Sequence, residues 1–292
     1  MKDYVICTDS CVDLPHEIAK KLELNVIPLS FQIEGNVYYN HLDERDMKHK
    51  EFYDLLRNKK ISQTSQINPE QFKEFFETFL KAGKDILYIG FSSALSGTLN
   101  SSLIARMDLE EMYPDRKIVI VDSLSASMGQ GLLLTHAANL RLEGKSIDEV
   151  ATWVEENKLR VCHLFTVGDL HHLKRSGRLS QAKALLGTVL RIKPILHVDK
   201  DGKLVQTGQS RGRRTALKKL VERMKETIEN PEEQIIYISH ADCYEEVIQL
   251  KQEILNEIPI RHILINFIGP VIGSHAGLGT IAIFYFGNDR LG

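Results

Sequence analysis

Residues 91–102 read Phe91-Ser92-Ser93-Ala94-Leu95-Ser96-Gly97-Thr98-Leu99-Asn100-Ser101-Ser102, and they stand between the apolar segments 86–89 and 103–105. This order predicts a buried strand, a hydroxyl-rich turn and a helix. The first N–H groups of a helix lack intrahelical partners, and the helix dipole adds partial positive charge there. Small hydroxyl residues before such an end can hold a carboxylate or a phosphate. The pattern is equally typical of a helix capped by its own Ser or Thr, so both interpretations stay open.

Strands and helices alternate in the part of the chain around this turn. Apolar runs typical of buried strands lie at residues 4–7, 25–29, 86–89 and 118–121. Helices are predicted over residues 14–22, 44–56, 128–142 and 147–157, and from Pro69 onward, where Phe72, Phe75, Phe76, Phe79 and Leu80 form an apolar stripe at helical spacing. A small hairpin is predicted over 31–38. This alternation predicts a doubly wound, mostly parallel sheet, which would bind a ligand at the carboxyl ends of its strands.

The second half of the chain mixes hairpins with helices. Strands are predicted at residues 161–167, 195–198, 204–207, 234–239, 262–267 and 281–286, and helices at 182–190, 211–226 and 245–257. Asp201-Gly202, between two of these strands, is typical of a tight hairpin turn. We therefore expect two domains: an N-terminal α/β domain at residues 1–158 and a C-terminal α+β domain with a mixed sheet at residues 159–292.

Two further segments carry groups that could bind an anion. Thr64-Ser65-Gln66 belongs to a polar, uncharged stretch that we interpret as a second hydroxyl-rich loop before a helix, although helix capping is the favoured explanation when this loop is taken alone. His275 lies in a glycine-dense segment, 269–280, interpreted as a loop in which backbone can approach a ligand closely. Its imidazole could donate a hydrogen bond to an anion, and the alternative is a solvent-exposed turn histidine.

The composition is that of a globular protein. The 292 residues are 43% apolar and 26% charged, and no apolar run approaches the length of a membrane span. Because the chain enters a strand within its first residues, we expect no signal peptide, and hence reduced thiols in the cytoplasm. Cys7, Cys11 and His16 match no zinc-binding spacing, so packing is the favoured interpretation and no metal is expected.

Positive charge is concentrated in one segment. Residues 170–221 hold thirteen Lys and Arg and only two acidic residues, which gives this segment a charge of +11. Since the net charge of the whole chain is −2, the remaining residues together carry −13. A basic surface of this kind attracts phosphates, acidic protein faces or nucleic acid, and the alternative is a helix face that only adds solubility. The segment has no interleaved aromatic residues and no evident helix-turn-helix, so nucleic-acid binding is not expected.

Five motifs occur in the order found in a known family. They are Thr8-Asp9-Ser10, Thr64-Ser65-Gln66, Ser92-Ser93-Ala94-Leu95-Ser96-Gly97-Thr98, Leu173-Lys174-Arg175-Ser176-Gly177-Arg178 and His275-Ala276-Gly277-Leu278-Gly279. Together they resemble the bacterial DegV family of fatty-acid-binding proteins, and the resemblance runs from the first strand to the last. One departure is Leu278, where many members have proline.

The resemblance implies one long-chain fatty acid, such as palmitate, buried between two domains. In the family, the threonine and serine that match Thr64 and Ser96 hydrogen-bond the carboxylate, and the histidine that matches His275 lies near it. Ser65, Ser93 and Gly97, from the same motifs, are expected at the same head group.

The resemblance also implies a partner. Members serve as the lipid-presenting subunit of a fatty acid kinase, in which a separate ATP-binding protein makes acyl phosphate. The arginines that match Arg178 and Arg211 are associated with the basic face and with that reaction. We expect no catalytic residue and no cofactor besides the bound fatty acid. We also expect no membrane-spanning segment, whereas transient contact with a membrane stays open.

One enzymatic alternative remains. Ser96 or Ser93 could act with His275 in a hydrolase or acyltransferase of lipid esters. The chain has no G-x-S-x-G elbow, and the sequence assigns no acid to such a triad.

Overall fold

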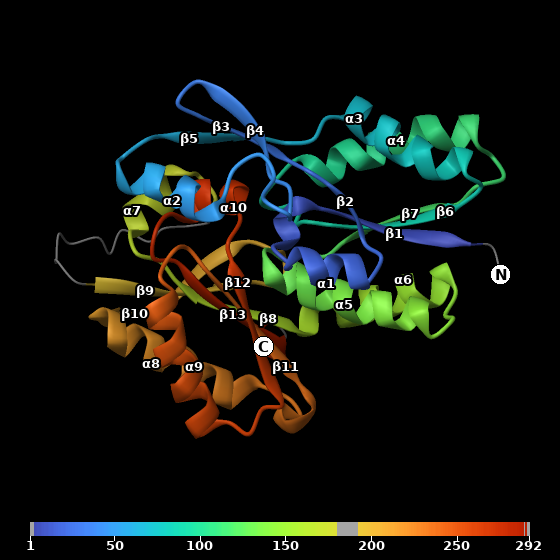
Figure 1. The fold of residues 1–292 in the computed structure, drawn as a ribbon. Coiled ribbons are helices and arrows are strands. Elements are labelled where there is room, and N and C mark those ends of the chain that lie inside the picture. Colours follow the sequence, from blue (N-terminus) through green and yellow to red (C-terminus); the bar gives the residue numbers. More distant parts are fainter. Residues whose placement is uncertain (1–2, 180–191, 289, 291–292) are drawn as a thin grey trace.

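Two β-sheets with helices between and outside them form the body of the molecule (Figure 1). The computed structural model describes residues 3–179, 192–288 and 290. Figure 1 shows the layers one above the other: helices, the first sheet, helices, the second sheet and a last pair of helices. The helix predicted over 182–190 lies outside the described residues.

The first sheet is parallel, with strand order β2-β1-β6-β7. Its strands are β1 (Tyr4–Asp9), β2 (Asn25–Ile27), β6 (Asp85–Gly90) and β7 (Ile118–Asp122). Helices α3 (Pro69–Lys81) and α4 (Thr98–Met112) cover one face, whereas α5 (Met128–Leu142) and α6 (Ile147–Asn157) cover the other. Side chains alternate across the sheet, so that Val5 packs under α3 and α4 and Ile6 packs against α5. The doubly wound parallel sheet predicted from the sequence is confirmed.

Local sequence explains where α3 begins. Asn68 and Gln71 form a capping box, in which each side chain accepts a hydrogen bond from the other's backbone N–H at 2.9 Å. Pro69 fits the first helical position because its missing N–H would have no partner there. Phe72, Phe76 and Leu80 are buried against the sheet, as the predicted stripe requires.

The second sheet is mixed, with strand order β10-β9-β8-β13-β11-β12. Its strands are β8 (Val161–Thr166), β9 (Ile192–Val198), β10 (Leu204–Arg211), β11 (Ile235–His240), β12 (His262–Phe267) and β13 (Ile281–Phe286). Only β11 and β12 run parallel, and the other pairs are antiparallel. Helices α8 (Arg213–Thr227) and α9 (Tyr244–Glu257) pack on one face, and α5 packs on the other. The predicted mixed α+β architecture is confirmed.

Helix α5 joins the two sheets into one core. Leu133 belongs to an apolar cluster that contains both Ile6 of β1 and Phe165 of β8. The boundary between residues 158 and 159 therefore divides a continuous core, and as a domain boundary it stays a prediction.

A small antiparallel sheet, β4-β3-β5, lies beside these layers. It comprises β3 (Ser30–Ile33), β4 (Asn36–Tyr39) and β5 (Ser62–Ser65), with the short helices α2 (His49–Arg57), α7 (Leu170–Arg175) and α10 (Pro270–Ala276) packed near it (Figure 1). The predicted hairpin over 31–38 is present as β3 and β4.

Several local predictions were wrong. Thr64 and Ser65 belong to strand β5 and not to a loop, because their backbone pairs with β3. His275 lies on helix α10 and not in a loop, and Pro270 opens this helix at its first turn. The helix predicted from residue 44 starts at His49, and the helix predicted from Arg211 starts at Arg213, because Arg211 still pairs with β9 in β10. For β5 and α10, tertiary pairing or packing outweighs the local polar or glycine-rich composition.

Candidate ligand-binding site

A cavity of about 340 Å³ lies between the two sheets and the small sheet. Its apolar wall includes Leu29 and Phe91, which follow β2 and β6 of the first sheet, and Phe165, Val198 and Phe284 of the second sheet. The polar residues Thr64, Ser96 and His275 also line it. The structure thus brings together three residues that lie far apart in the sequence, on β5, on the turn after β6 and on α10.

Strand β5 and helix α10 are joined by two neighbouring side-chain pairs. Thr64 Oγ1 lies 2.7 Å from His275 Nε2, and Ser62 Oγ lies 2.7 Å from Ser274 Oγ. Residues two apart on a strand point to the same face, so β5 meets successive residues of α10. When Nε2 carries the ring proton, the imidazole donates to Thr64, and the hydroxyl proton of Thr64 can be donated to a ligand.

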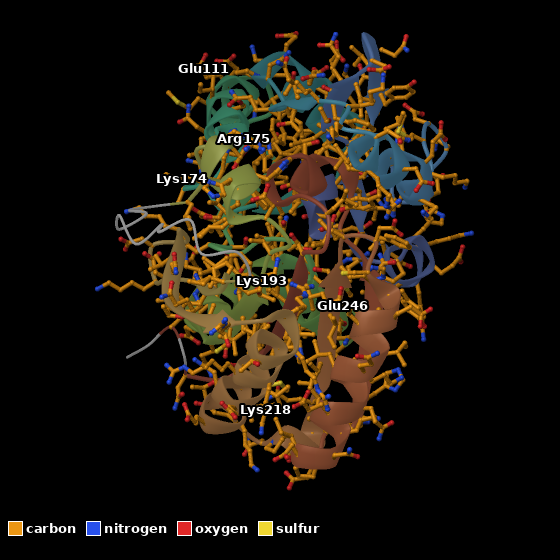
Figure 2. All side chains as sticks on the ribbon, turned by 90° about the vertical axis from the view of Figure 1, so that its left-hand side faces the viewer. Glu111, Lys174, Arg175, Lys193, Lys218 and Glu246 are labelled. Atoms are coloured by element: carbon orange, nitrogen blue, oxygen red, sulfur yellow. The ribbon has the colours of Figure 1, made fainter. Side chains whose placement is uncertain are left out.

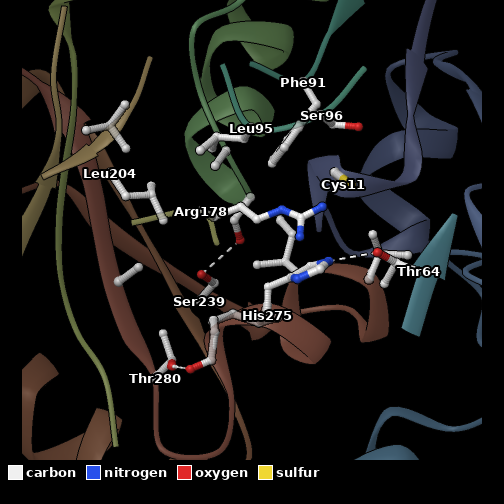
Figure 3. A pocket seen from close by; sticks show the side chains of 18 of the residues that line it. Cys11, Thr64, Phe91, Leu95, Ser96, Arg178, Leu204, Ser239, His275 and Thr280 are labelled. Atoms are coloured by element: carbon white, nitrogen blue, oxygen red, sulfur yellow. Dashed lines mark hydrogen bonds between the residues drawn. The ribbon is translucent and has the colours of Figure 1, made fainter. Parts of the chain in front are cut away.

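The imidazole of His275 is neutral at pH 7. Burial, followed by the nearby charges of Arg178 and His172, lowers the pKa of His275 to about 4. Figure 3 shows the guanidinium of Arg178 and the imidazole of His275 pointing into the same part of the cavity, with Thr64 beyond the imidazole. One permanent positive charge and several neutral donors therefore face the same space, a combination that suits a carboxylate.

The serine-rich turn is held from behind by a buried carboxyl group. Asp9 Oδ2 accepts hydrogen bonds from Phe91 N at 2.9 Å and from Tyr88 Oη at 3.0 Å. Within the turn, Ser96 Oγ accepts from Thr98 N at 3.3 Å and lies 3.0 Å from Thr98 Oγ1. Ser96 thus contributes to capping α4 and lines the cavity as well, so the two interpretations of this turn are compatible.

The other predicted site residues divide between the cavity and the surface. Ser65, Gly97 and Arg178 line the cavity. Ser93 is exposed and is not among the lining residues, and its backbone N–H donates to the carboxylate of Asp122. Arg211, the last residue of β10, is exposed and also lies outside the lining. The structure therefore separates Ser93 from Ser96, and Arg178 from Arg211.

Several lining residues were not recognised as site residues in the sequence. Gln66 lines the cavity directly after β5, although its motif had been noted. Ser127, just before α5, and Ser239, on β11, are also lining residues, and their hydroxyls lie 3.0 Å apart. Behind them, burial raises the pKa of Asp13 to about 7. No sequence signal marks these groups, because their proximity arises only when α5 packs against the second sheet.

A tight contact between Gly97 and Gln66 gives a first testable prediction. A Cβ atom at position 97 would lie 2.2 Å from Gln66 Oε1, so Gly97→Ala must displace this flexible side chain. Alanine suits the backbone angles of Gly97, φ −71° and ψ 0°, and the fold should therefore be retained. We expect the affinity for a carboxylate ligand to fall by about three- to tenfold, which corresponds to the loss of one hydrogen bond. Fluorescence competition measures this affinity.

Gly208→Ala is the matched control for this variant. Position 208 lies on β10, outside the lining, and an added Cβ would make only ordinary contacts, at 3.8 Å or more. Equal affinities of the two variants would show that Gln66 and Gly97 do not contribute to the head-group site.

The described residues offer neither a metal site nor a membrane-spanning helix. Residues 3–179, 192–288 and 290 hold no cluster of three or more His, Cys, Asp or Glu placed to bind a metal ion. Cys7 and Cys11 pack in the core beneath α3 and α4. Within the same residues, every helix is too short or too polar to span a bilayer.

Comparison with known proteins identifies relatives along the whole chain. The sequence pattern described as "Uncharacterised protein, DegV family" matches residues 3–288. A DegV domain-containing protein of Clostridium perfringens is 47% identical over 290 residues, which is 99% of each chain. A second one, from Lactococcus lactis, is 35% identical over 281 residues and 96% of each chain.

Solved structures share the fold. A DegV family protein from Thermus thermophilus, described by its fatty acid binding, has 30% identity and a TM-score of 0.88, with 98% of this chain and 100% of that chain covered. DegV of Bacillus subtilis, described as a fatty acid binding protein, has 27% identity and a TM-score of 0.83, with 97% and 99% covered. Since pattern, relatives and fold agree over nearly the full length, this chain belongs to the DegV family.

Proposed function

We propose that this protein binds one long-chain fatty acid, such as palmitate, in the cavity between its two sheets. The proposal depends mainly on how polar and apolar residues are distributed in the cavity wall. Thr64, Ser96 and His275 gather in one region, and the wall is otherwise largely apolar. The descriptions of the Thermus thermophilus and Bacillus subtilis relatives as fatty acid binding support it. The carboxylate would accept hydrogen bonds from the hydroxyls of Thr64 and Ser96, with His275 donating to Thr64 from behind and with Ser65 and Gly97 beside it.

Energetics favour such a ligand. Burying about fourteen methylene groups at ~0.8 kcal/mol each supplies roughly 11 kcal/mol before the costs of association. A buried carboxylate without partners would cost several kcal/mol, so the hydroxyl donors and the charge of Arg178 are needed at one end only.

We further propose a carrier role, in which the protein presents the carboxylate to a separate cytoplasmic fatty acid kinase and makes no product alone. Figure 2 shows Lys174, Arg175, Lys193 and Lys218 on one face, and the first two lie on α7, shortly before Arg178. An ATP-binding partner with an acidic surface would be attracted to this face. Among the described residues, Ser96 makes its side-chain hydrogen bond with Thr98 and His275 makes its own with Thr64, a pattern that does not favour a serine nucleophile.

Native mass spectrometry of the purified protein, followed by lipid extraction, tests the binding proposal. We expect a complex heavier than the bare chain by the mass of one long-chain fatty acid, and the free acid in the extract. A bare chain that also fails to bind added palmitate would refute the proposal.

A comparison of two arginines tests the carrier role. Arg178→Ala should weaken fatty-acid binding about tenfold, because Arg178 lines the cavity and its charge acts on His275. Arg211→Ala should leave binding unchanged, because this residue is exposed and outside the cavity, and should slow acyl-phosphate formation by the kinase. Binding is measured by isothermal titration with palmitate and the coupled reaction by ATP consumption. Loss of lipid in Arg211→Ala would contradict the assignment.

A further inference from the structure

A row of lining residues on β13 leads from the proposed head-group region into the interior. Thr280, just before β13, and Ala282 and Phe284, on the strand, all line the cavity, and residues two apart share one face of a sheet. The hydroxyl of Thr280 donates to carbonyl oxygens at the end of α10, the helix that carries His275. Phe284 lies four residues farther along, which is roughly 13 Å in an extended strand. The row therefore runs away from the head group.

The row ends at a pair of aromatic rings. His163 of β8 is the register partner of Phe284 and also lines the cavity, and the two ring centroids are 5.3 Å apart at an interplanar angle of 86°. The next pair on this face, Val161 and Phe286, does not line the cavity. Phe286 packs instead against the ring of His136 of α5, at 4.9 Å between centroids. The pair of His163 and Phe284, called the end wall below, thus has packed core behind it.

His163 is held in place by groups from both sheets. Ala126, in the segment after β7, donates its N–H to Nε2 at 3.2 Å, and Nδ1 lies 2.9 Å from the carbonyl oxygen of Val161. Because Nε2 accepts a hydrogen bond, the ring proton is on Nδ1 and is donated to Val161. On α5, a Cβ atom at Gly129 would lie 2.2 Å from Nε2, so helix backbone packs directly against the ring. The ring therefore has no room to retreat from the cavity.

The end wall is apolar although it contains a histidine. Both ring nitrogens of His163 are bonded to the protein backbone, so neither is left to bind a ligand. Burial, followed by the nearby charge of Arg290, lowers the pKa of His163 well below its ordinary value, which keeps the ring neutral. His163 is 1% exposed and Phe284 is 2% exposed, so the wall is closed. Two closed aromatic rings suit contact with a terminal methyl group.

We propose that the end wall is the stop for the methyl end of the acyl chain and sets the longest fatty acid that the cavity accepts. With the carboxylate held by Thr64 and Ser96, each added carbon brings the methyl end closer to the wall. Every methylene up to contact adds apolar burial, whereas a further carbon must displace a ring that has no room to move. This inference rests on the proposed fatty-acid function and specifies its substrate class by chain length.

Competition binding with saturated acids from laurate to behenate tests the stop. We expect the affinity to rise by about fourfold per methylene up to one chain length, and to fall by at least about tenfold for acids that exceed it by two carbons. An affinity that rises or stays level through to behenate would overturn the stop and leave the fatty-acid function intact. Failure of every acid to bind would overturn both.

Two substitutions of His163 separate the ring from its hydrogen bonds. His163→Ala and His163→Phe both remove the bonds to Ala126 and Val161, but only the first removes the ring. His163→Ala should lengthen the longest acid that binds tightly by about two carbons, because it leaves space at the end of the cavity. His163→Phe should keep the wild-type limit. An unchanged limit in His163→Ala, or the same shift in both variants, would contradict the assignment.

Phe284→Leu tests the other half of the end wall and decides the matter if the His163 variants do not fold. It removes no hydrogen bond, and it should also raise the chain-length limit. Phe91→Leu is the matched control, since Phe91 lines the cavity too but belongs to the same turn as Ser96, at the head-group end. Its limit should be that of the wild type. Equal limits in Phe284→Leu and Phe91→Leu would show that the end wall does not measure the chain.

Discussion

The variant Thr64→Val/Ser96→Ala is expected to lose its fatty acid during purification and to bind palmitate at least about 100-fold more weakly than the wild type. A hydrogen bond to a charged group contributes about 1.5–3 kcal/mol, and this variant removes two hydroxyl groups that face the proposed carboxylate position. Both substitutions are conservative in size, and neither side chain is part of the apolar core. Native mass spectrometry of the purified chain and titration with palmitate measure the loss.

A second double variant separates this effect from a general loss of stability. Thr78→Val/Ser93→Ala removes the same two hydroxyl types at exposed positions outside the cavity, so its lipid occupancy should equal that of the wild type. The head-group assignment fails if Thr64→Val/Ser96→Ala retains full occupancy while its melting temperature matches that of the control.

The sequence is most informative where local pattern and tertiary structure agree. The strand, turn and helix around residues 86–105 were predicted because an apolar run, a hydroxyl-rich turn and a helical segment follow one another without ambiguity. The parallel sheet then follows from the alternation of such units, and with it the position of Ser96 at the carboxyl end of β6.

The sequence is least informative where an element depends on a distant partner. Strand β5 reads Ser-Gln-Thr-Ser, which has no apolar alternation, and it becomes a strand only because β3 pairs with it. Helix α10 contains a glycine and is followed by another, a composition that predicts a loop, yet its packing against α2, α7 and β5 stabilises it. The family resemblance placed Thr64 and His275 at one head group, but the hydrogen bond between them depends on both of these elements.

Arg178 illustrates a different limit. The resemblance associates it with the basic face, and its side chain, although exposed, also lines the cavity. A net charge of +11 over residues 170–221 cannot distinguish a residue that lines the cavity from residues that lie outside it. That distinction requires the three-dimensional arrangement of α7 and α10.

Asp13 has the largest expected effect on stability, and this effect depends on pH. Its pKa is about 7 in the folded chain against an ordinary value of 3.8, because burial disfavours the charged form. The folded state therefore binds more protons than the unfolded state between about pH 4 and pH 7. It follows that the contribution of Asp13 to the free energy of unfolding is fully present below pH 4 and is lost as the pH rises through 7. The difference in pKa corresponds to about 4 kcal/mol.

The pH dependence of the free energy of unfolding of the wild type does not by itself isolate the contribution of Asp13, since buried histidines act in the opposite direction. Burial lowers the pKa of His240 and of His275 to about 4, so their contribution is present above pH 6.5 and is lost as the pH falls toward 4. The contributions of Asp13 and of the histidines change in opposite directions between about pH 4 and pH 6.5, so they partly cancel there. A substitution at position 13 that keeps the structure therefore has to be compared with the wild type at each pH.

Asp13→Asn meets this requirement. The asparagine oxygen can accept from Gly269 N and its amide can donate to Ser127 Oγ, so both hydrogen bonds of Asp13 are kept. Asparagine also tolerates the left-handed backbone of this position, where φ is 49°. Urea unfolding at pH 5, 6, 7 and 8 should show the variant gaining stability relative to the wild type as the pH rises, by about 3 kcal/mol over this range. Because the histidines are the same in both chains, a constant difference across this range would mean that Asp13 is already ionised at pH 5 and that its burial does not control its protonation.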